Sequence, residues 1–565
     1  MWRQHRSIGL GLAVLFLVSC AKSGVHNKVA PPSDESAAQA ASIIVTGTRS
    51  LPRLAYEAAP MDMVAPAPPP PPAPGMYLPP NWSPPYHDVG RDRFTSVDEN
   101  PFRIVSEAPV STFSIDVDTA SYSWVRASLN QNLLPQPAAV RIEEMVNYFP
   151  YDYAPPHTRE QPFSTDVAVF PSPWSEGRKL VRIGIKGYSV ERSARPHANL
   201  VFLIDTSGSM QEPKKLPLVK QSLEMLLDEL APSDTVAIVT YAGYAGTALE
   251  PTEVRDKRKI EAVIDSLGAG GSTAGAEGIR QAYALAEANL DPKGVNRVML
   301  ATDGDFNVGI TNQEELKGYV ERERDKGVFL SVLGFGMGNY NDALMQTLAQ
   351  NGNGAAAYID TLSEARKTLV EEAGSTLFPI AKDVKIQVEF NPAAVAEYRL
   401  IGYETRALKR DDFDNDKVDA GDVGSGQTVT ALYEIVPLGG RRTMADLRYS
   451  VPAKLAARSG DEYGYVKIRY KLPKSSTSRL ISTPIDRRKE AASFAAAPQD
   501  ARFAAAVAGF AEMLRGGKYS GTMNYDDVVK IAAASRGHDE FGYRSEFVQL
   551  VRAAKGARTL AKLDQ

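Results

Sequence analysis

Four short apolar runs in the middle of the chain each end in glycine or in polar residues. They read NLVFLIDTSG, TVAIVTYAG, RVMLATDGD and VFLSVLGFG. Such β-branched-rich runs predict strands buried on both faces of a parallel sheet. Between them lie LPLVKQSLEMLLDEL, AEGIRQAYALAEANL and QEELKGYVERERDKG, which have helical spacing. The first of these places Leu216, Val219, Leu223, Leu226, Leu227 and Leu230 on one stripe. Strands that alternate with helices predict an α/β domain with a doubly wound parallel sheet over residues 198–377.

The segments on either side of this domain alternate apolar and polar residues, which predicts antiparallel strands. FSTDVAVFPSPWSEGRKLVRIGIKGYSV precedes the domain, and KDVKIQVEFNPAAVAEYRLIGYETRAL follows it with TVTALYEIVPL, ADLRYSVPA and YGYVKIRYKLP. We therefore expect a β-sandwich with the α/β domain inserted in it or docked on it. The last segments, AAPQDARFAAAVAGFAEMLRG, NYDDVVKIAAASRG and EFGYRSEFVQLVRAAKGARTL, predict helices that cap the sandwich.

The first residues predict export. Arg3 and Arg6 precede the apolar stretch SIGLGLAVLFLV, which is shorter than the roughly 20 residues of a spanning helix and is typical of a signal peptide over residues 1–20. Cys20 is the only cysteine in the 565 residues, so stability must come from large cores rather than from disulfides. Residues 21–93, rich in Pro, Ala and Ser, predict a disordered tether with a polyproline II spacer.

Five oxygen-bearing side chains occur where these strands, or a Gly-rich loop, end. They are Asp205, Ser207 and Ser209 in VFLIDTSGSM, Thr273 in GGSTAGAEG and Asp303 in RVMLATDGD. An open parallel sheet would bring all five to the edge where such sheets bind ligands. Two carboxylates and three hydroxyls form a hard oxygen set that suits Mg²⁺, Mn²⁺ or Ca²⁺. Because hydroxyls bring no charge, the cation would stay electrophilic and accept a carboxylate oxygen from another molecule.

This order of residues resembles the metal-ion-dependent adhesion site of von Willebrand factor type A domains, D-x-S-x-S followed by Thr and then Asp, at all five positions. The resemblance implies that Asp205, Ser207, Ser209 and Thr273 bind or closely approach the cation, whereas Asp303 binds directly or through water. It favours Mg²⁺, with Mn²⁺ or Ca²⁺ as alternatives, and a protein partner that offers an acidic side chain. We expect the nearby Asp305 and Asn307 to shape the loop.

Two further resemblances concern the whole chain. LVSC resembles a bacterial lipobox, which implies that Cys20 becomes the acylated N-terminus, and Ala21 after it is typical of lipoproteins sent to the outer membrane of Gram-negative bacteria. STFSIDVDTASY and EEMVNYFPYDY resemble the YfbK-like family of bacterial lipoproteins from about residue 97 to the end. That family implies an N-terminal α+β region over residues 94–197, the type A domain over 198–377 and a C-terminal β-rich then helical domain over 378–565.

The sequence lacks the complete motifs of other functional classes. Asp116, Asp118 and Thr119 in DVDTA imitate the nucleophile loop of haloacid-dehalogenase phosphatases, but the Lys and acidic pair of that chemistry cannot be placed without reusing strands of the type A domain. The six histidines are scattered, and no H-E-x-x-H, G-x-S-x-G or P-loop segment is present. A net charge of −4 and a pI near 6.0 show no electrostatic footprint for nucleic acid.

We therefore expect a non-enzymatic, membrane-anchored protein that binds a protein partner through a divalent cation. Two alternatives remain: a metal-dependent hydrolase or hydrolase subunit, and an envelope scaffold in which the metal is purely structural. A hydrolase would need a carboxylate, His or Lys within reach of a metal-bound water, whereas an adhesion site needs no such base.

Overall fold

The computed structural model describes residues 92–158, 160–271, 275–304, 313–338, 340–418, 420–445 and 461–563. The predicted signal peptide with Cys20, all but the last residues of the predicted tether, and Thr273, Asp305 and Asn307 lie outside these ranges. The described residues belong to one unit of the chain, Trp82–Gln565.

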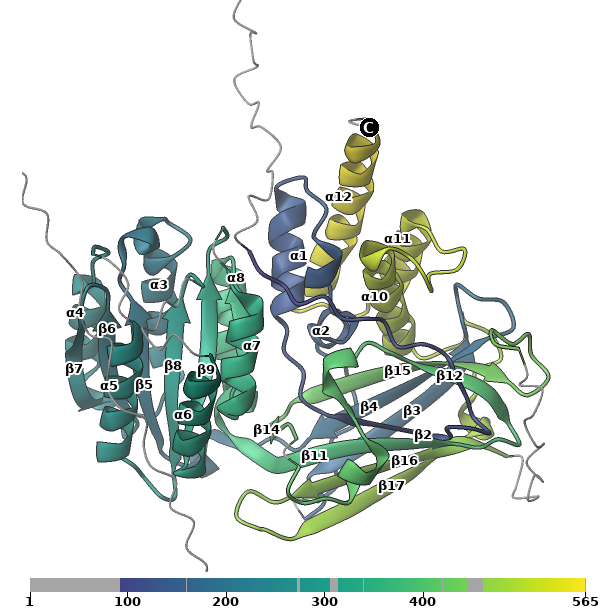
Figure 1. Ribbon diagram of the computed structural model, residues 1–565, viewed down its shortest axis with the longest axis horizontal. Coiled ribbons are helices and arrows are strands. Elements are labelled where there is room, and N and C mark those ends of the chain that lie inside the picture. The colour runs from purple at the N-terminus through teal and green to yellow at the C-terminus, as the bar shows by residue number, and fades with distance from the viewer. Residues whose placement is uncertain are drawn as a thin grey trace, which may run out of the picture. The chain divides into compact units, whose positions relative to one another are not determined.

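The type A region is built on a six-stranded sheet with the order β10-β9-β8-β5-β6-β7 (Figure 1). Its strands are β5 (Ala198–Asp205), β6 (Thr235–Tyr241), β7 (Ala245–Glu253), β8 (Val295–Thr302), β9 (Val328–Phe335) and β10 (Ala356–Ile359). All neighbours are parallel except β7, which runs antiparallel to β6. The four apolar runs are thus confirmed as strands. The edge strand β7 was not predicted, because its half-exposed residues carry no apolar run.

Helices lie on both sides of this sheet (Figure 1). They are α3 (Leu216–Leu227), α4 (Lys257–Ser266), α5 (Gly275–Ala288), α6 (Gln313–Asp325), α7 (Asp342–Asn351), α8 (Leu362–Arg366), a π-helix (Lys367–Glu371) and α9 (Ala373–Leu377). Val201 and Leu203 of β5 share a core with α5, whereas Leu200 and Phe202 share another with α3. Alternate residues of one strand therefore face two helical layers, which confirms the doubly wound α/β prediction.

Two antiparallel sheets form the predicted sandwich. One has the order β1-β12-β15-β4-β3 and the other β13-β2-β11-β16-β17, with β14 paired to β11. The bounds are β1 (Arg103–Ile104), β2 (Val110–Ser114), β3 (Phe163–Pro171), β4 (Lys179–Gly187), β11 (Pro379–Phe390), β12 (Val395–Ile401), β13 (Ala407–Leu408), β14 (Val423–Gly424), β15 (Thr428–Pro437), β16 (Glu462–Lys471) and β17 (Ser478–Asp486). Val169 and Val181 of one sheet share a single core with Ile386 and Val388 of the other. The type A region is inserted between β4 and β11, and most of the predicted strand ADLRYSVPA lies outside the described residues.

The remaining helices cover one sheet of the sandwich. They are α1 (Ala120–Asn130), α2 (Ile142–Asn147), α10 (Gln499–Arg515), α11 (Tyr525–Ala534) and α12 (Tyr543–Leu563). Their core joins Phe503 of α10 and Phe547 of α12 to Leu180 of β4 and Leu432 of β15, as expected for capping helices. In the described part of the chain we find no helix with the length and apolar character needed to cross a membrane.

Residues 94–197 were predicted to form a region separate from the type A domain, but helix α1 of this region packs partly against the type A sheet. Its Tyr122 and Val125 pack in the core of the capping helices, whereas Trp124 and Ala127 pack in the core of the type A sheet. The ring of Trp124 stacks on Tyr340 at 5.5 Å between centroids. One helix therefore contributes to two cores, which a single amphipathic stripe in the sequence does not predict.

Candidate metal centre

Asp205 is the last residue of β5 and is fully buried. The backbone N–H of Ser207 donates to its Oδ1 at 2.8 Å, and within the described part of the chain Oδ2 has no hydrogen-bond partner. Burial, and to a smaller extent the charge of Asp303, raises the pKa of this carboxyl to about 6. The hydroxyls of Ser207 and Tyr241 lie near this carboxyl and lower its pKa in part. A buried carboxylate oxygen without a hydrogen bond is costly unless a cation binds it.

The D-x-S-x-S segment turns immediately after this carboxylate. A short 3₁₀ turn, Gly208–Gln211, follows Ser207, and the hydroxyls of Ser207 and Ser209 lie 3.1 Å apart. Ser207 is buried, whereas Ser209 is exposed. The turn thus brings two of the predicted ligands together at the edge of the sheet.

The loop that precedes Thr273 is hydrogen-bonded to this turn, although Thr273 itself lies outside the described residues. The N–H of Gly270 donates to the carbonyl of Thr206 at 2.8 Å, and the N–H of Gly208 donates to the carbonyl of Gly271 at 3.1 Å. Gly271 has a φ of +93°, a conformation that L-residues with a side chain rarely adopt. The Gly-rich loop therefore reaches the D-x-S-x-S turn, as the predicted site requires.

Asp303 follows β8 at the same edge, because Ala301 of β8 pairs with Ile204 of β5. Its carboxylate is buried, and its Oδ2 accepts a hydrogen bond from Lys215 Nζ at 3.0 Å. Lys215 is itself only 3% exposed. Its aliphatic chain crosses Gly336, where an added Cβ would lie 2.5 Å from Lys215 Cε. The ammonium group of this lysine is thus held against one predicted ligand.

Sequence reasoning missed Lys215, because a lysine just before an amphipathic helix usually faces solvent. The available signal was its place in KKLPLVK, ten residues after Asp205 and directly before α3. Its position adds a fixed positive charge to the site.

The donor atoms present fit a hard divalent cation. Two carboxylates and two hydroxyls approach one edge among the described residues, and hydroxyl and carboxylate oxygens suit Mg²⁺, Mn²⁺ or Ca²⁺. No group of three or more His, Cys, Asp or Glu side chains in the described ranges is arranged to hold a metal. Serine and threonine oxygens would therefore have to complete the coordination.

The phosphatase-like segment DVDTA holds the chain before α1 against Arg406 and β10. Arg406 forms ion pairs with Asp116 and Asp118 at 2.8 Å each, and Asp118 Oδ1 accepts the N–H of Ala356 in β10. Burial, and then the charge of Asp116, raise the pKa of Asp118 to about 7. Both carboxylates thus fasten the segment before α1.

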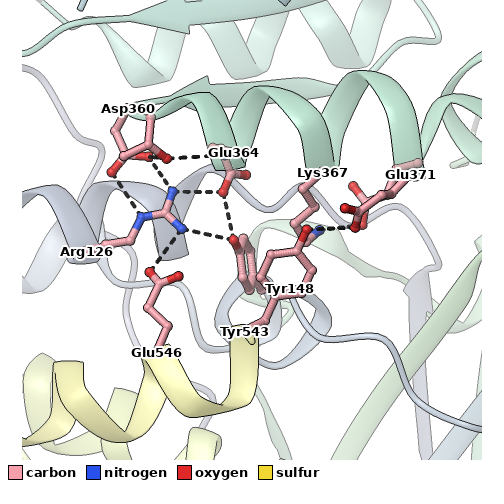
Figure 2. A network of polar contacts seen from close by, with 10 residues as sticks. Arg126, Tyr148, Asp360, Glu364, Lys367, Glu371, Tyr543 and Glu546 are labelled. Carbon is pink, nitrogen blue, oxygen red and sulfur yellow. Dashed lines mark hydrogen bonds and ion pairs between the residues drawn. The ribbon is translucent and has the colours of Figure 1, made fainter. Parts of the chain in front are cut away.

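A second polar cluster lies at α8, near the end of the type A region (Figure 2). Arg126 of α1 donates to Asp360 Oδ2 at 3.0 Å and to Glu364 Oε2 at 2.8 Å. The same guanidinium donates to Tyr148 Oη at 3.0 Å and to Glu546 Oε1 of α12 at 3.2 Å. We call these five residues the Arg126 network. It joins α1, α8 and α12 through charge pairs, of which those of Arg126 with Asp360 and Glu364 are buried.

Comparison with known proteins places these regions in described families. Residues 199–372 match the von Willebrand factor type A domain, residues 88–182 match a family described as von Willebrand factor, and residues 375–557 match the C-terminal region of the uncharacterized protein YfbK. Human inter-alpha-trypsin inhibitor heavy chain H4 is 29% identical over 202 residues, which are 34% of this chain and 21% of that protein. A solved von Willebrand factor type A structure from Catenulispora acidiphila is 16% identical, with a TM-score of 0.38, over 72% of this chain and 91% of that one.

The uncharacterized protein YfbK of Escherichia coli (strain K12) is 44% identical over 480 residues. The match covers 84% of this chain and 83% of that protein. It extends well beyond the type A domain, so it includes the sandwich and the helices. The chain therefore belongs to the YfbK-like family of proteins with a von Willebrand factor type A domain.

Proposed function

We propose that this chain is a membrane-anchored protein that binds a protein partner through a divalent cation at the edge of the type A sheet. The observation that supports it best is the buried Asp205 Oδ2, which has no hydrogen-bond partner among the described residues. The cation would be held by Asp205, Ser207, Ser209, Thr273 and Asp303. We expect Mg²⁺, with Mn²⁺ or Ca²⁺ as alternatives.

The charge balance favours an acidic partner. Asp205 and Asp303 together would neutralise a divalent cation, but the ammonium of Lys215 already compensates Asp303. The centre would therefore keep a positive charge close to one unit. When bound, the cation supplies a Lewis acid that accepts a carboxylate oxygen, and an Asp or Glu of the partner has that chemistry.

The hydrolase alternative requires a base beside a metal-bound water. Lys215 lies at the same edge of the sheet as the predicted ligands, but its ammonium group donates a hydrogen bond to Asp303. The scaffold alternative requires only that the metal stabilise the loops. Removing the metal would then weaken the fold without releasing a partner.

We expect Asp205→Ala to abolish divalent-cation binding while the fold is kept, because the residue ends a strand at the sheet edge. Calorimetric titration of Mg²⁺ and Mn²⁺ into both proteins tests this. Asp265→Ala, at an exposed aspartate in the last turn of α4, is the matched control. Equal titration curves for wild type and Asp205→Ala would remove the metal assignment.

The partner is tested by affinity capture from solubilised cell envelope. A specific partner should be retained with Mg²⁺, released by EDTA, recaptured when Mg²⁺ is restored, and absent from Asp205→Ala. Retention of the same protein in EDTA would favour the scaffold alternative.

The anchor and the location are part of the same proposal. The apolar stretch before LVSC and the single Cys20 support acylation, and Ala21 supports delivery to the outer membrane of a Gram-negative cell. The tether of residues 21–93 would hold the folded part away from the bilayer.

A further inference from the structure

A cavity of about 970 Å³ lies beside the start of β8, at the end of the strand opposite to Asp303. Its lining comes from the type A region, including Arg297 and Gly374, and from the sandwich, including Lys186 and the segment 424–428 around the end of β14. We call it the β14 cavity. Its volume is in the range of pockets that hold small molecules.

Arg297 of β8 is a buried cation in this lining. It is 3% exposed, and its Nη1 donates to Ser331 Oγ at 2.6 Å. Its guanidinium carbon lies 5.6 Å from the centre of the Phe329 ring. Its Nε is buried and has no hydrogen-bond partner within the described ranges. Burial lowers the pKa of Arg297 to about 10, although the charge of Asp422 opposes this shift.

The other buried arginines of the described chain differ from Arg297 in their partners. All of them form an ion pair with a carboxylate: Arg126, Arg182, Arg399, Arg406 and Arg544. No such pair is found for Arg297 among the described residues. An unpaired buried charge lowers the stability of the fold, so Arg297 destabilises the protein where an apolar side chain would not.

Two further cations border the same cavity. Lys186 donates to the carbonyl of Gly426 at 2.8 Å, and burial lowers its pKa. Arg195 has a buried Nε without a hydrogen-bond partner in the described part, and its Nη2 lies 3.5 Å from the Cβ position of Gly374. That position is 3.7 Å from the carbonyl oxygen of Ser425. Lys186 and Arg195 therefore approach the same short segment after β14.

Several carboxylates of the lining already have partners. Asp116 and Asp118 bind Arg406, and Glu372 binds Lys367. Glu371 accepts the hydroxyl of Tyr543, as Figure 2 shows. Asp422 accepts the backbone N–H of Asp383 at 3.2 Å, and its charge acts on Arg297. Glu321 adds a further carboxylate to the lining. Among the described residues, no carboxylate forms an ion pair with Arg297, Lys186 or Arg195, which all line the cavity. The charges of Asp422 and Asp152 act on Arg297 and Lys186 without forming such a pair.

We propose that the β14 cavity binds a small anionic molecule, and that Arg297 holds its phosphate or carboxylate group. A guanidinium presents parallel N–H donors that match two oxygens of either group. Lys186, which also lines the cavity, would add a point charge. This site is separate from the metal centre, so it is independent of the proposed cation-dependent binding.

Calorimetric titration of the full chain with inorganic phosphate and with citrate, at constant ionic strength, tests the proposal. Wild type should bind at least one of the two probes, and the probe that binds distinguishes a phosphate ligand from a carboxylate ligand. Arg297→Met should weaken that binding by at least about tenfold, as expected when one partner of a buried charged contact is removed. Arg280→Met, at an exposed arginine of α5, should stay within about twofold of wild type.

Asp205→Ala should keep the anion affinity of wild type, which separates this proposal from that of the metal centre. Where Arg297→Met does not fold, Lys186→Met replaces it and should weaken binding by at least about threefold. Equal affinity in wild type and in the folded Arg297→Met protein would overturn the proposal. Failure of wild type to bind either probe would overturn it as well.

Discussion

At the scale of single residues, Lys215 adds a permanent cation to a site that is proposed to hold another. Its Nζ lies 3.0 Å from Asp303 Oδ2, and its chain is confined against Gly336. A positive charge this close repels a metal ion, yet it also holds the Asp303 carboxylate in place. Lys215 is therefore expected to limit the affinity for the cation and to preserve its electrophilic character.

Lys215→Met should bind Mn²⁺ about tenfold more tightly than wild type, because one repelling charge a few ångströms away is removed. Calorimetry with Mn²⁺ measures this, and Lys214→Met, one residue earlier in the exposed turn, is the control. A weaker affinity in Lys215→Met would mean that the main role of Lys215 is to position Asp303.

Glu143 of α2 predicts a pH dependence of stability. Its carboxyl is fully buried, and Oε2 lacks a hydrogen-bond partner among the described residues. Burial, followed by the charges of Glu404 and Glu144, raises its pKa from 4.5 to about 7. The folded protein therefore holds a proton that the unfolded chain releases between these values. This contribution to stability is present at low pH and is lost as the pH rises from about 4.5 to 7.

Glu143→Gln should remove that loss, because the amide stays neutral at every pH. At pH 8 we expect it to be more stable than wild type by up to about 3 kcal/mol, whereas at pH 4.5 the two should be similar. Urea denaturation at both pH values measures the difference, with the exposed Glu107→Gln as control. An unchanged difference between the two pH values would show that Glu143 is solvated or paired.

At the scale of elements, the end of the type A region is held by charge rather than by a long helix. The three short helices α8, the π-helix and α9 follow one another, and Arg126 binds Asp360 and Glu364 at their start. Lys367 Nζ lies 4.4 Å from the centre of the Tyr148 ring. Figure 2 shows these contacts around α8 and the π-helix. This arrangement restrains an element that has little helical propensity of its own.

Arg126→Met should therefore destabilise the protein by about 3–5 kcal/mol, since it leaves two carboxylates buried without their cation. Hydrogen exchange over residues 362–377 should increase more than exchange in the strands of the sheet. Arg552→Met, an exposed arginine of α12, is the control and should change neither quantity. Unchanged exchange over residues 362–377 would show that apolar packing alone holds this segment.

The elements also show what the sequence can predict. Strands β5, β6, β8 and β9 follow from continuous apolar runs, and the ligands after β5 follow from a short motif. Strand β7 has no such pattern, because an edge strand is half solvated. The pairing of β2 with β11 joins residues about 270 positions apart, which local periodicity cannot encode. Arg297 and Lys215 were missed because the sequence does not show whether a charged side chain will be buried.

At the scale of the whole molecule, a very short connection joins the end of the type A region to the sandwich, whereas residues 188–197 form the longer connection before it. Helix α9 ends at Leu377 and β11 begins at Pro379, so one residue separates them. Strand β11 pairs with both β2 and β16 and lies centrally in its sheet. A displacement of the last helix would thus act directly on the sandwich. The Arg126 network opposes such a displacement, so we expect coupling only where binding energy exceeds the cost of breaking it.

The last prediction concerns how the molecule is held at a membrane. If Cys20 is acylated, Cys20→Ser should leave the chain as an unprocessed precursor or release it from the membrane fraction, because no other cysteine can take its place. One acyl chain binds a bilayer only marginally, so stable anchoring needs the several chains of a bacterial lipoprotein. Membrane fractionation with mass spectrometry of the mature N-terminus measures both outcomes, and Ser23→Ala, three residues beyond the modified position, is the control. A Cys20→Ser protein that is processed normally and stays in the outer membrane would show that something other than lipid holds the chain there.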